Sequence, residues 1–485
     1  MSHAIESALH DVVGPPDELA REIKHDYSSS HDGIVPLEAR RGTWSHHVPL
    51  WVTLYAGFSY MALGSELYAM GYGLGRMLAI VAVSGALYLA YAVPAAYLGA
   101  WRGQTHALMS RSVFGLAGSW IVSLLVMITP LGWVGYQSNT LATIWDGLYG
   151  WGGVTAIGIV IAIVGIVNNV LGFTGITAFA RWVAGPVTVL WVVWMVVKAL
   201  TQTHGSVLSS HAKVDAPSTF ALGVIIAIGF ATYGNEPDLF RYAKPRWGAV
   251  VPPLAIGLVV GLLLFPLAGW IIAARIGDAD FGKGVSEAVS FSLFGLSLVA
   301  FLLATATQIA VNDANYYEAL NAGQNLLGGW SRWRRVYTCA ILAAGGGFMA
   351  WWVPQSLDNF FKAATFLAVT VPTATVIMYV DQLLLPRLLG ITRDLSRVPS
   401  WSQAAFANWP AIVALLAGMA YGAYGSGIIP GVSAPTGVLG KGIVPVQAWV
   451  LGGVLYVALT ALARAAGGES LLGFPQVDAE PGAAD

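Results

Sequence analysis

The sequence has few charged residues and one cysteine. Asp, Glu, Lys and Arg make up 10% of the 485 residues, whereas a soluble domain carries about 25%. Because Cys339 is the only cysteine, an intramolecular disulfide and a cysteine-based metal site are excluded. The formal net charge is −1, so the chain lacks the basic surplus of a nucleic-acid-binding protein.

Sequence signals for membrane enzymes and channels are also missing. There is no phosphate-binding glycine loop, no soluble catalytic domain and no row of arginines typical of a voltage sensor. Histidines at positions 46, 47, 106, 204 and 211 fall in loops or at the ends of apolar stretches, without metal-ligand spacing. We therefore expect neither an enzyme nor a cofactor. A passive channel and a sensor that binds without transporting remain open.

Hydrophobic residues are abundant, at 56% of the chain, so most of its surface needs lipid as solvent. A helix crosses a bilayer with about 20 apolar residues. The first ~45 residues are polar and lack the basic start and apolar core of a signal peptide, so we expect a cytoplasmic tail. About twelve membrane spans are predicted, near residues 49–72, 77–99, 115–145, 154–173, 179–200, 219–241, 249–274, 291–316, 336–353, 358–384, 409–429 and 444–464.

Basic residues predict the orientation of these spans. With the N-terminus inside, most Lys and Arg residues fall in cytoplasmic segments, as the positive-inside rule requires. The chain is thus expected to be a multi-pass protein of the cell's inner (plasma) membrane with both termini in the cytoplasm. The expected divisions are a tail (1–47), a ten-helix core (48–385, with repeats near 48–200 and 219–385), two additional helices (386–465) and a C-terminal tail (466–485).

Two apolar spans contain similar interruptions. Span 1 has Gly57, Phe58 and Ser59 in "GFSY", and span 6 has Gly229, Phe230 and Ala231 in "GFATY". Five spans separate them, so the second copy enters the membrane from the opposite side, as in an inverted repeat with broken helices.

Broken helices of this kind can form a binding site. Irregular backbone survives in a membrane only where it lines a protein cavity, and its freed N–H and C=O groups can bind a polar solute and a cation. Phe58 and Phe230, beside the breaks, could face a flat ligand. The alternative is two ordinary glycines in continuous helices, which are common in membranes.

Span 3 contains a pair suited to a planar heterocycle. Trp133 and Gln137 are four residues apart in "GWVGYQ" and share a helix face. An indole can stack on a ring, and a carboxamide both donates and accepts hydrogen bonds. The alternative for Gln137 is a bond to a neighbouring helix.

Span 8 carries a polar stripe. Its members have the helical spacing i, i+3, i+7 and i+10, so they cannot all face lipid. They are predicted to line a cavity or to pack against other polar helices. The stripe comprises Thr305, Gln308, Asn312 and Asn315.

Acidic residues within the spans are candidates for proton transfer. Glu66 in span 1, Asp313 in span 8 and Asp381 near the end of span 10 are such residues, and Glu236 and Asp238 follow the span 6 interruption. Asp238 and Arg241 are three residues apart, so a local ion pair with a structural or gating role is expected for them.

Several short motifs resemble one family when taken in order. They are "GWVGYQ" (132–137), "PDLFRYAKP" (237–245), "VNDANYY" (311–317) and "TVPTATVIMYVDQ" (370–382). Together they are similar to the nucleobase:cation symporter-1 family, the purine–cytosine permease group, which includes cytosine permeases and a hydantoin transporter. The resemblance covers nearly the whole chain.

The resemblance implies an all-α membrane protein with a five-plus-five inverted-repeat core, broken helices 1 and 6, and two further helices. It implies inward symport of a nucleobase, with cytosine or a purine favoured, coupled to Na⁺ or H⁺. The alternative is the same fold carrying hydantoin, allantoin, a thiamine precursor or an amino acid. The expected partners are the heterocycle and the lipid bilayer, with a monomer as the expected state.

Site residues follow from the same resemblance. Trp133 would stack on the substrate, and Gln137 and Asn312, with Gln308 on the same stripe, would bind its edge. The interruption at 229–231 would form a second wall, with Phe58 also lining the site. Carbonyls of Gly57 and Phe58, with Thr307 and Thr305, would bind Na⁺. Because Ala306 stands where sodium-coupled relatives have a second hydroxyl, the coupling ion could instead be H⁺.

Overall fold

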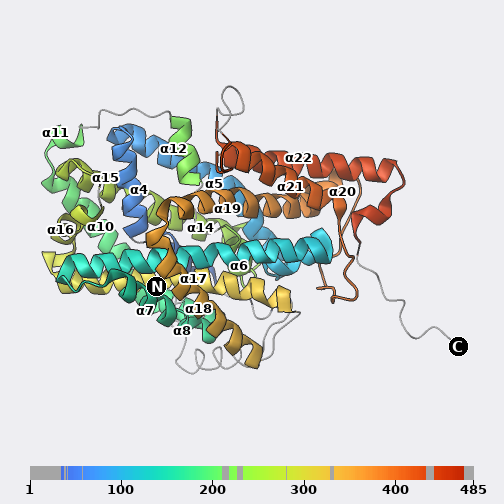
Figure 1. Cartoon of the computed structure of the whole chain (residues 1–485), viewed down its shortest axis with the longest axis horizontal. Coiled ribbons are helices and arrows are strands. Elements are labelled where there is room, and N and C mark those ends of the chain that lie inside the picture. Colours follow the sequence, from blue (N-terminus) through green and yellow to red (C-terminus); the bar gives the residue numbers. More distant parts are fainter. Residues whose placement is uncertain are drawn as a thin grey trace, which may run out of the picture.

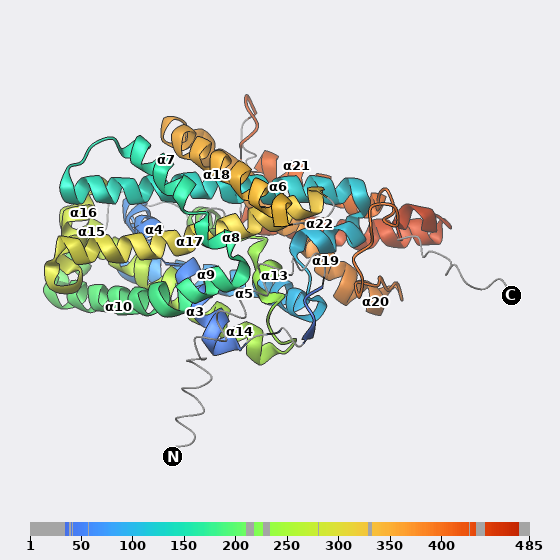
Figure 2. The ribbon, with the colours of Figure 1, turned by 90° about the horizontal axis from the view of Figure 1, so that it is seen from below.

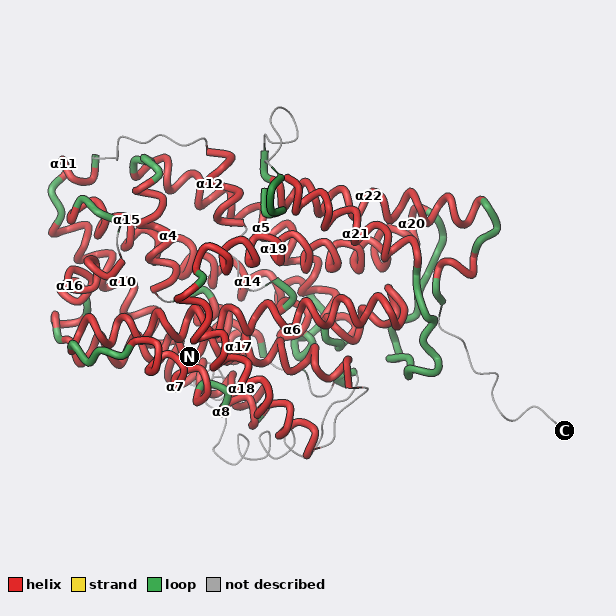
Figure 3. Tube along the Cα trace, in the orientation of Figure 1, coloured by secondary structure: helices red, strands yellow, loops and turns green. Residues whose placement is uncertain are grey.

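The computed structural model describes residues 34–37, 40, 42–56, 58–209, 218–226, 233–279, 281–327, 332–425, 427–432 and 442–474. In this part of the chain every regular element is helical and no strand is present, as Figure 3 shows. An all-α architecture is therefore confirmed.

The first half of the chain forms α-helices with two π-helical segments, η2 and η3. Their bounds are η2 (Thr43–His47), α3 (Val48–Leu54), α4 (Phe58–Ala69), α5 (Leu74–Arg102), α6 (His106–Tyr149), α7 (Val154–Val164), α8 (Val167–Val170), α9 (Gly172–Phe179), η3 (Ala180–Ala184), α10 (Gly185–Gln202) and α11 (Gly205–Leu208).

The second half includes π-helical segments η5 and η7 and short 3₁₀ turns η6 and η8. Its elements are α12 (Ser218–Val224), α13 (Asn235–Phe240), α14 (Trp247–Leu258), η5 (Val259–Leu264), α15 (Phe265–Ile276), α16 (Phe281–Phe291), η6 (Leu293–Gly295), α17 (Ser297–Leu327), α18 (Arg332–Gln355), α19 (Leu357–Tyr379), η7 (Val380–Leu384), α20 (Leu385–Leu388), α21 (Trp409–Gly425), α22 (Val444–Ala465) and η8 (Glu469–Leu472).

The predicted spans correspond to these helices. Among the described residues, 8 helices are long and apolar enough to cross a membrane, and two shorter apolar helices, Val154–Val170 and Trp409–Gly425, coincide with predicted spans 4 and 11. The remaining two predicted spans are the interrupted ones, formed by α3 with α4 and by α12 with α13. The multi-pass helical fold is thus confirmed.

The helices of spans 1 and 6 are divided near the predicted interruptions, although Gly57 and residues 227–232 themselves lie outside the described part of the chain. Helix α3 ends at Leu54 and α4 begins at Phe58, and Tyr55 between them has non-helical angles (φ −95°, ψ 15°). Helix α12 ends at Val224 and α13 begins at Asn235, after Gly234 in a left-handed conformation (φ 98°). Spans 1 and 6 therefore each consist of two helical segments.

Span 8 differs from its predicted limits. It was expected at 291–316, but α17 starts at Ser297 and continues to Leu327. The residues before it form a separate helix, α16, that ends at Phe291 and is followed by the turn η6, in which Phe294 has a positive φ of 59°. After residue 316 the segment "YEALNAGQNLL" is rich in good helix formers, so the helix extends beyond the apolar stretch.

The long helices lie lengthwise beside one another. In Figures 1 and 2, α6 and α17 run side by side through the molecule, and α19, α21 and α22 pack together near one edge. Helix α6 is two helices joined at Gly115 (φ 75°, ψ −178°), so the predicted start of span 3 coincides with this kink.

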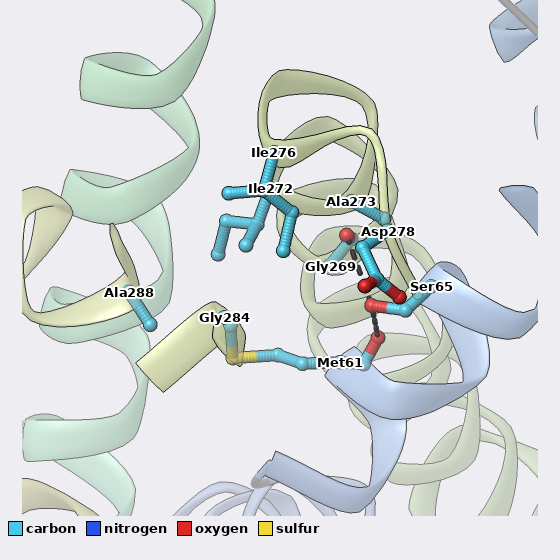
Figure 4. Close-up of a pocket in the computed structure, with 9 residues that line it drawn as sticks. All are labelled: Met61, Ser65, Gly269, Ile272, Ala273, Ile276, Asp278, Gly284 and Ala288. Carbon is cyan, nitrogen blue, oxygen red and sulfur yellow. Dashed lines mark hydrogen bonds between the residues drawn. The ribbon is translucent and has the colours of Figure 1, made fainter. Parts of the chain in front are cut away.

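Glycines bring the second half of broken span 1 against span 7. A Cβ on Gly64 of α4 would collide with the Pro266 carbonyl of α15, and one on Gly269 with the Met61 carbonyl. Figure 4 shows this contact, where the Ser65 hydroxyl donates to the carbonyls of Gly269 (3.2 Å) and Met61 (3.4 Å). Close packing thus positions α4 although the helix is interrupted.

Large apolar side chains cover much of the outer surface. Exposed members occur on α7, α10, α18 and α22, whereas aromatic residues such as Trp51, Tyr55 and Trp270 are fully buried. A soluble protein rarely exposes so many large apolar residues. This distribution is that of a protein whose solvent is the hydrocarbon of a bilayer.

Candidate functional site

Helices α6 and α17 bring four of the predicted site residues together. The side chain of Gln308 on α17 donates to the Gln137 carboxamide oxygen on α6 at 2.8 Å. One turn along, the Asn312 amide donates to the hydroxyl of Ser138 at 3.1 Å. Trp133 lies one turn from Gln137 on α6.

Trp133 lies in a small aromatic cluster. It is 4% exposed and packs with Val353 of α18 and Ala364 of α19. The ring of Tyr136 meets its indole edge to face, with centroids 5.8 Å apart. The indole is thus held in place by neighbours, as a stacking surface for a ring would require.

The amides also contact the interruption in span 1. Gln137 donates from Nε2 to the hydroxyl of Ser59 at 3.1 Å. Ser59 is the second residue of α4, directly after the interruption. Three helices, α4, α6 and α17, therefore meet through Gln137. The alternative prediction for this residue, a hydrogen bond to a neighbouring helix, is thus present, and Gln137 also lies beside the interruption.

The same network leaves polar atoms unsatisfied. Oε1 of Gln308 and Oδ1 of Asn312 have no hydrogen-bond partner among the described residues, although both side chains are almost fully buried. The Nδ2 atom of Asn315, further along α17, is also buried and unpaired. Buried polar atoms are nearly always hydrogen-bonded, so these atoms mark a place where a polar ligand or water would bind.

Other predicted contacts cannot be placed. Gly57, Gly229, Phe230 and Ala231 lie outside the described residues. Phe58 begins α4, but its side chain is outside the described part as well.

The two threonines of span 8 face different ways. The Thr305 hydroxyl accepts from the Trp145 indole (3.0 Å) and donates to the Phe301 carbonyl (2.7 Å). It lines an apolar groove between α6, α7, α8, α9 and α17. Thr307 is about 200° further around the helix and donates to the carbonyls of Leu303 and Ala304. The structure does not bring the two hydroxyls together.

The two predicted proton carriers have different surroundings. Asp313 is buried and accepts from Asn168 of α8 at 2.8 Å, while its Oδ1 has no partner among the described residues. Glu66, in contrast, is exposed on α4. Of these two carboxylates, Asp313 is the enclosed one.

Asp238 and Arg241 make no direct ion pair or hydrogen bond with each other, although their charges interact. The carboxylate of Asp238 accepts from the backbone N–H of His106 (2.5 Å) and from the amide of Asn321 (3.0 Å). Arg241 instead donates to the hydroxyl of Tyr317 on α17 at 2.8 Å. The reason is that α13 is buried between α5, α6 and α17, which supply better-placed partners than its own next turn.

Sequence reasoning missed several residues in this region. Glu318 of α17 is 1% exposed but was outside the predicted span. Tyr88 of α5 donates to Glu236 at 2.8 Å and accepts from Tyr55 at 2.5 Å. Only the helix-forming composition after residue 316 pointed toward Glu318, and no sequence signal distinguished Tyr88 from other membrane tyrosines.

Comparison with known proteins agrees with this architecture. Residues 34–452 match the family model described as "Permease for cytosine/purines, uracil, thiamine, allantoin". The cytosine permease of Escherichia coli K12 is 27% identical over 410 residues, covering 82% of this chain and 90% of that protein. A purine–uracil permease of Arabidopsis thaliana is 25% identical over 443 residues, covering 82% and 72%.

Solved structures share the fold. The nucleobase-cation-symport-1 family transporter Mhp1, closed with bromovinylhydantoin bound, superposes with a TM-score of 0.68 at 15% identity, covering 90% of this chain and 96% of Mhp1. A Na⁺-coupled sialic acid symporter in a substrate-bound outward-open state gives a TM-score of 0.62 at 10% identity, covering 91% and 95%. The likeness to Mhp1 confirms the predicted inverted-repeat fold with broken helices 1 and 6.

The family match spans most of the chain, and α6 and α17, which carry two of the motifs, meet at a buried polar network. The chain therefore belongs to the cytosine/purine, uracil, thiamine and allantoin permease family, as a multi-pass membrane transporter and not an enzyme.

Proposed function

We propose that this chain carries a nucleobase or a related planar heterocycle into the cell by cation-coupled symport, with cytosine or a purine favoured. Transport proceeds by alternating access. The observation that carries the proposal is the pair of buried, unpaired carbonyl oxygens of Gln308 and Asn312. The names of the E. coli and Arabidopsis relatives support the same substrate class.

The chemistry of the network suits the edge of a nucleobase. Two unpaired acceptors on one face of α17 require N–H donors from the ligand, which cytosine and purines present beside ring acceptors. Trp133, one turn from Gln137, would stack on the ring. The interruption at 229–231 would form the opposite wall, with Phe58 also lining the site.

Coupling to a cation supplies the energy for accumulation. A Na⁺ ion would use carbonyls at Gly57 and Phe58 together with the Thr307 hydroxyl. Thr305 contributes no hydroxyl to this group, because its side chain already serves Trp145 in the groove. The proposal includes both termini in the cytoplasm of an inner (plasma) membrane, a transport core over 48–385, two accessory helices over 386–465 and a monomeric carrier.

An uptake panel tests the proposal. Purified protein in liposomes is given radiolabelled cytosine, hypoxanthine, uracil, hydantoin or allantoin under imposed Na⁺ or pH gradients. We expect saturable uptake of at least one base that exceeds equilibrium only when a gradient is present. Saturable uptake of none would refute the substrate class, and uptake indifferent to both gradients would indicate a passive channel.

Thermal stability gives an independent measurement. A ligand that binds only the folded protein raises its stability by RT ln(1 + [L]/Kd), about 2.7 kcal/mol at one hundred times Kd. The same panel is therefore added in detergent, with and without Na⁺. A base that is transported should also raise the melting temperature, and an amino acid should not.

A further inference from the structure

Two buried glutamates from different helices meet at the start of α13. Glu236 accepts from the Tyr88 hydroxyl at 2.8 Å and from the backbone N–H of Gly234 at 3.0 Å. Glu318 of α17 approaches Gly234 from the other side, where a Cβ on Gly234 would collide with Glu318 Oε1. Both carboxylates therefore border the same glycine, next to the interruption in span 6.

Glu318 lacks the partners that a buried carboxylate normally has. It is 1% exposed, and its Oε1 has no hydrogen-bond partner among the described residues. The side chain is directed at Gly234, so the unpaired oxygen is aimed into the space between α13 and α17. A buried charge without hydrogen bonds or a counter-ion is strongly unfavourable.

The arginine at the end of α13, Arg241, makes its hydrogen bonds to tyrosines, and its Nε and Nη1 have no partner among the described residues. Asp238 accepts hydrogen bonds on both oxygens, from His106 and Asn321, as an ionised carboxylate would. Arg241 interacts electrostatically with this carboxylate and donates to Tyr317. Neither Glu236 nor Glu318 has a Lys or Arg partner of its own among the described residues.

Apart from Arg241, the groups described around the pair include no Lys or Arg. The elements packed against α13 are α5, α6 and α17, and α19 borders Gly234 through Val371. Thr375 of α19, which bonds His106, does not titrate. The remaining titratable neighbours are Tyr88 and Tyr91 of α5, Tyr233 before α13, His106 of α6 and Tyr317 of α17.

A proton satisfies this arrangement better than a metal ion. No group of three or more His, Cys, Asp or Glu residues in the described part of the chain could hold a metal. Two adjacent carboxylates repel each other when both are charged, and a single proton removes that repulsion. An oxygen without a hydrogen bond can take the proton without losing an existing interaction.

We propose that Glu318 and Glu236 form the proton-binding site that couples transport to a pH gradient, an inference that rests on the proposed function. An O–H bond forms on a carboxylate oxygen when a proton enters from outside, and it breaks when the proton leaves to the cytoplasm. No other bond changes. The pair takes one proton per turnover and its net charge changes by one.

The pair is mechanically connected to the substrate network. Glu318 lies six residues after Asn312 on α17, about 9 Å along the helix axis. Glu236 is linked through Tyr88 to Tyr55, the first residue after α3 in the interruption of span 1. Protonation removes repulsion between α13 and α17, so it favours the arrangement in which these helices are close. By thermodynamic reciprocity, a substrate that favours the same arrangement raises proton affinity.

Proton uptake on binding is the first test. Cytosine, or the panel base that binds, is added to wild-type protein in weakly buffered detergent containing a pH dye. We expect about one proton taken up per base bound. At this stoichiometry one pH unit supports about tenfold accumulation in liposomes, since a pH unit and a tenfold concentration ratio have the same free energy.

Two substitutions then locate the proton. Glu318→Gln and Glu236→Gln should each abolish proton uptake and make base affinity independent of pH. In liposomes both should still exchange labelled for unlabelled base, while an acid-outside gradient no longer drives accumulation. Glu287→Gln is the matched control. Glu287 lies on α16, not on α13 or α17, and forms an ion pair with Arg275. This variant should behave as wild type. Asp313→Asn tests whether Asp313, the other predicted proton carrier on α17, binds the proton instead of the glutamate pair.

The outcomes separate this inference from the function itself. If a base binds and is accumulated with a Na⁺ gradient but no proton is taken up, the proton site is refuted while the transporter stands. Proton uptake that survives in both Gln variants and disappears in Asp313→Asn also refutes it. If no panel base binds or is transported, the proposed function fails and this inference with it. If the Gln variants do not fold, the proton uptake of the wild-type protein still tests the proposal, because binding without proton uptake refutes it.

Discussion

Replacing Asn312 with leucine should separate binding from stability. Asn312→Leu keeps the size and shape of the side chain and removes its polar atoms. The substrate-free protein loses the hydrogen bond to Ser138, about 1 kcal/mol, but no longer buries an unpaired carbonyl, which costs about 1–3 kcal/mol. The free energy of unfolding should therefore be unchanged or rise by up to about 2 kcal/mol.

The effect on binding should have the opposite sign. If the Asn312 carbonyl accepts a hydrogen bond from the base, its loss leaves a ligand donor unpaired, at a cost of about 1–3 kcal/mol. That corresponds to a Kd raised about 5- to 150-fold. The assay is radioligand binding together with the melting temperature of the same ligand-free preparation.

A neighbouring substitution provides the control. Thr305→Val also removes one polar atom from α17, but its hydroxyl faces the groove beside Trp145 and not the amide network. Base affinity should match wild type. An unchanged Kd in Asn312→Leu, or a protein strongly destabilised without ligand, would show that the unpaired carbonyl does not serve the substrate.

Three further substitutions follow from the structure. Trp133→Ala should raise the Kd for the base in radioligand binding while expression survives, because the lost stacking is worth about 0.5–1.5 kcal/mol beyond area burial; normal uptake would remove the indole from the site. Gly234→Ala should lower the melting temperature, since its φ of 98° and the adjacent buried carboxylate leave no room for a Cβ, whereas Gly248→Ala, with nothing within 4 Å, should not. Arg393→Met should cost about 3–5 kcal/mol in chemical denaturation, because it leaves buried Asp381 without its cation at 3.3 Å; equal stability to wild type would contradict the importance of this pair.

Much of the helical architecture was predictable because apolar length is a local property. The sequence predicted interruptions of spans 1 and 6 from small residues within apolar stretches, and in the structure α4 begins at Phe58 and α13 at Asn235. The limits of span 8 could not be predicted in this way. Its helix, Ser297–Leu327, includes buried polar residues that a hydropathy profile places outside the membrane. Buried neighbours, not hydropathy, keep that part of the helix out of solvent.

For the polar side chains, too, the sequence predicts the helix face and the tertiary structure decides the contact. Spacing alone placed Trp133 with Gln137, and Gln308 with Asn312, on their respective helix faces. It also placed Thr305 on the stripe, but in the structure that hydroxyl serves Trp145 in a separate groove. Which side chains of one stripe meet which neighbour depends on the rotation and tilt of each helix, and these are decided by packing between helices.

The sequence by itself determined that the protein is a helical membrane protein, where its spans lie, and which two spans are interrupted, because hydropathy and helix propensity act over neighbouring residues. Only the tertiary structure decided that Gln137 joins Gln308 to Ser59, that Asp238 and Arg241 form their hydrogen bonds with other residues, and that Glu318 and Glu236 both lie against Gly234. Glu236 and Glu318 are 82 positions apart in the chain, so no local pattern in the sequence predicts that they lie near each other. Their proximity arises when α13 and α17 pack together.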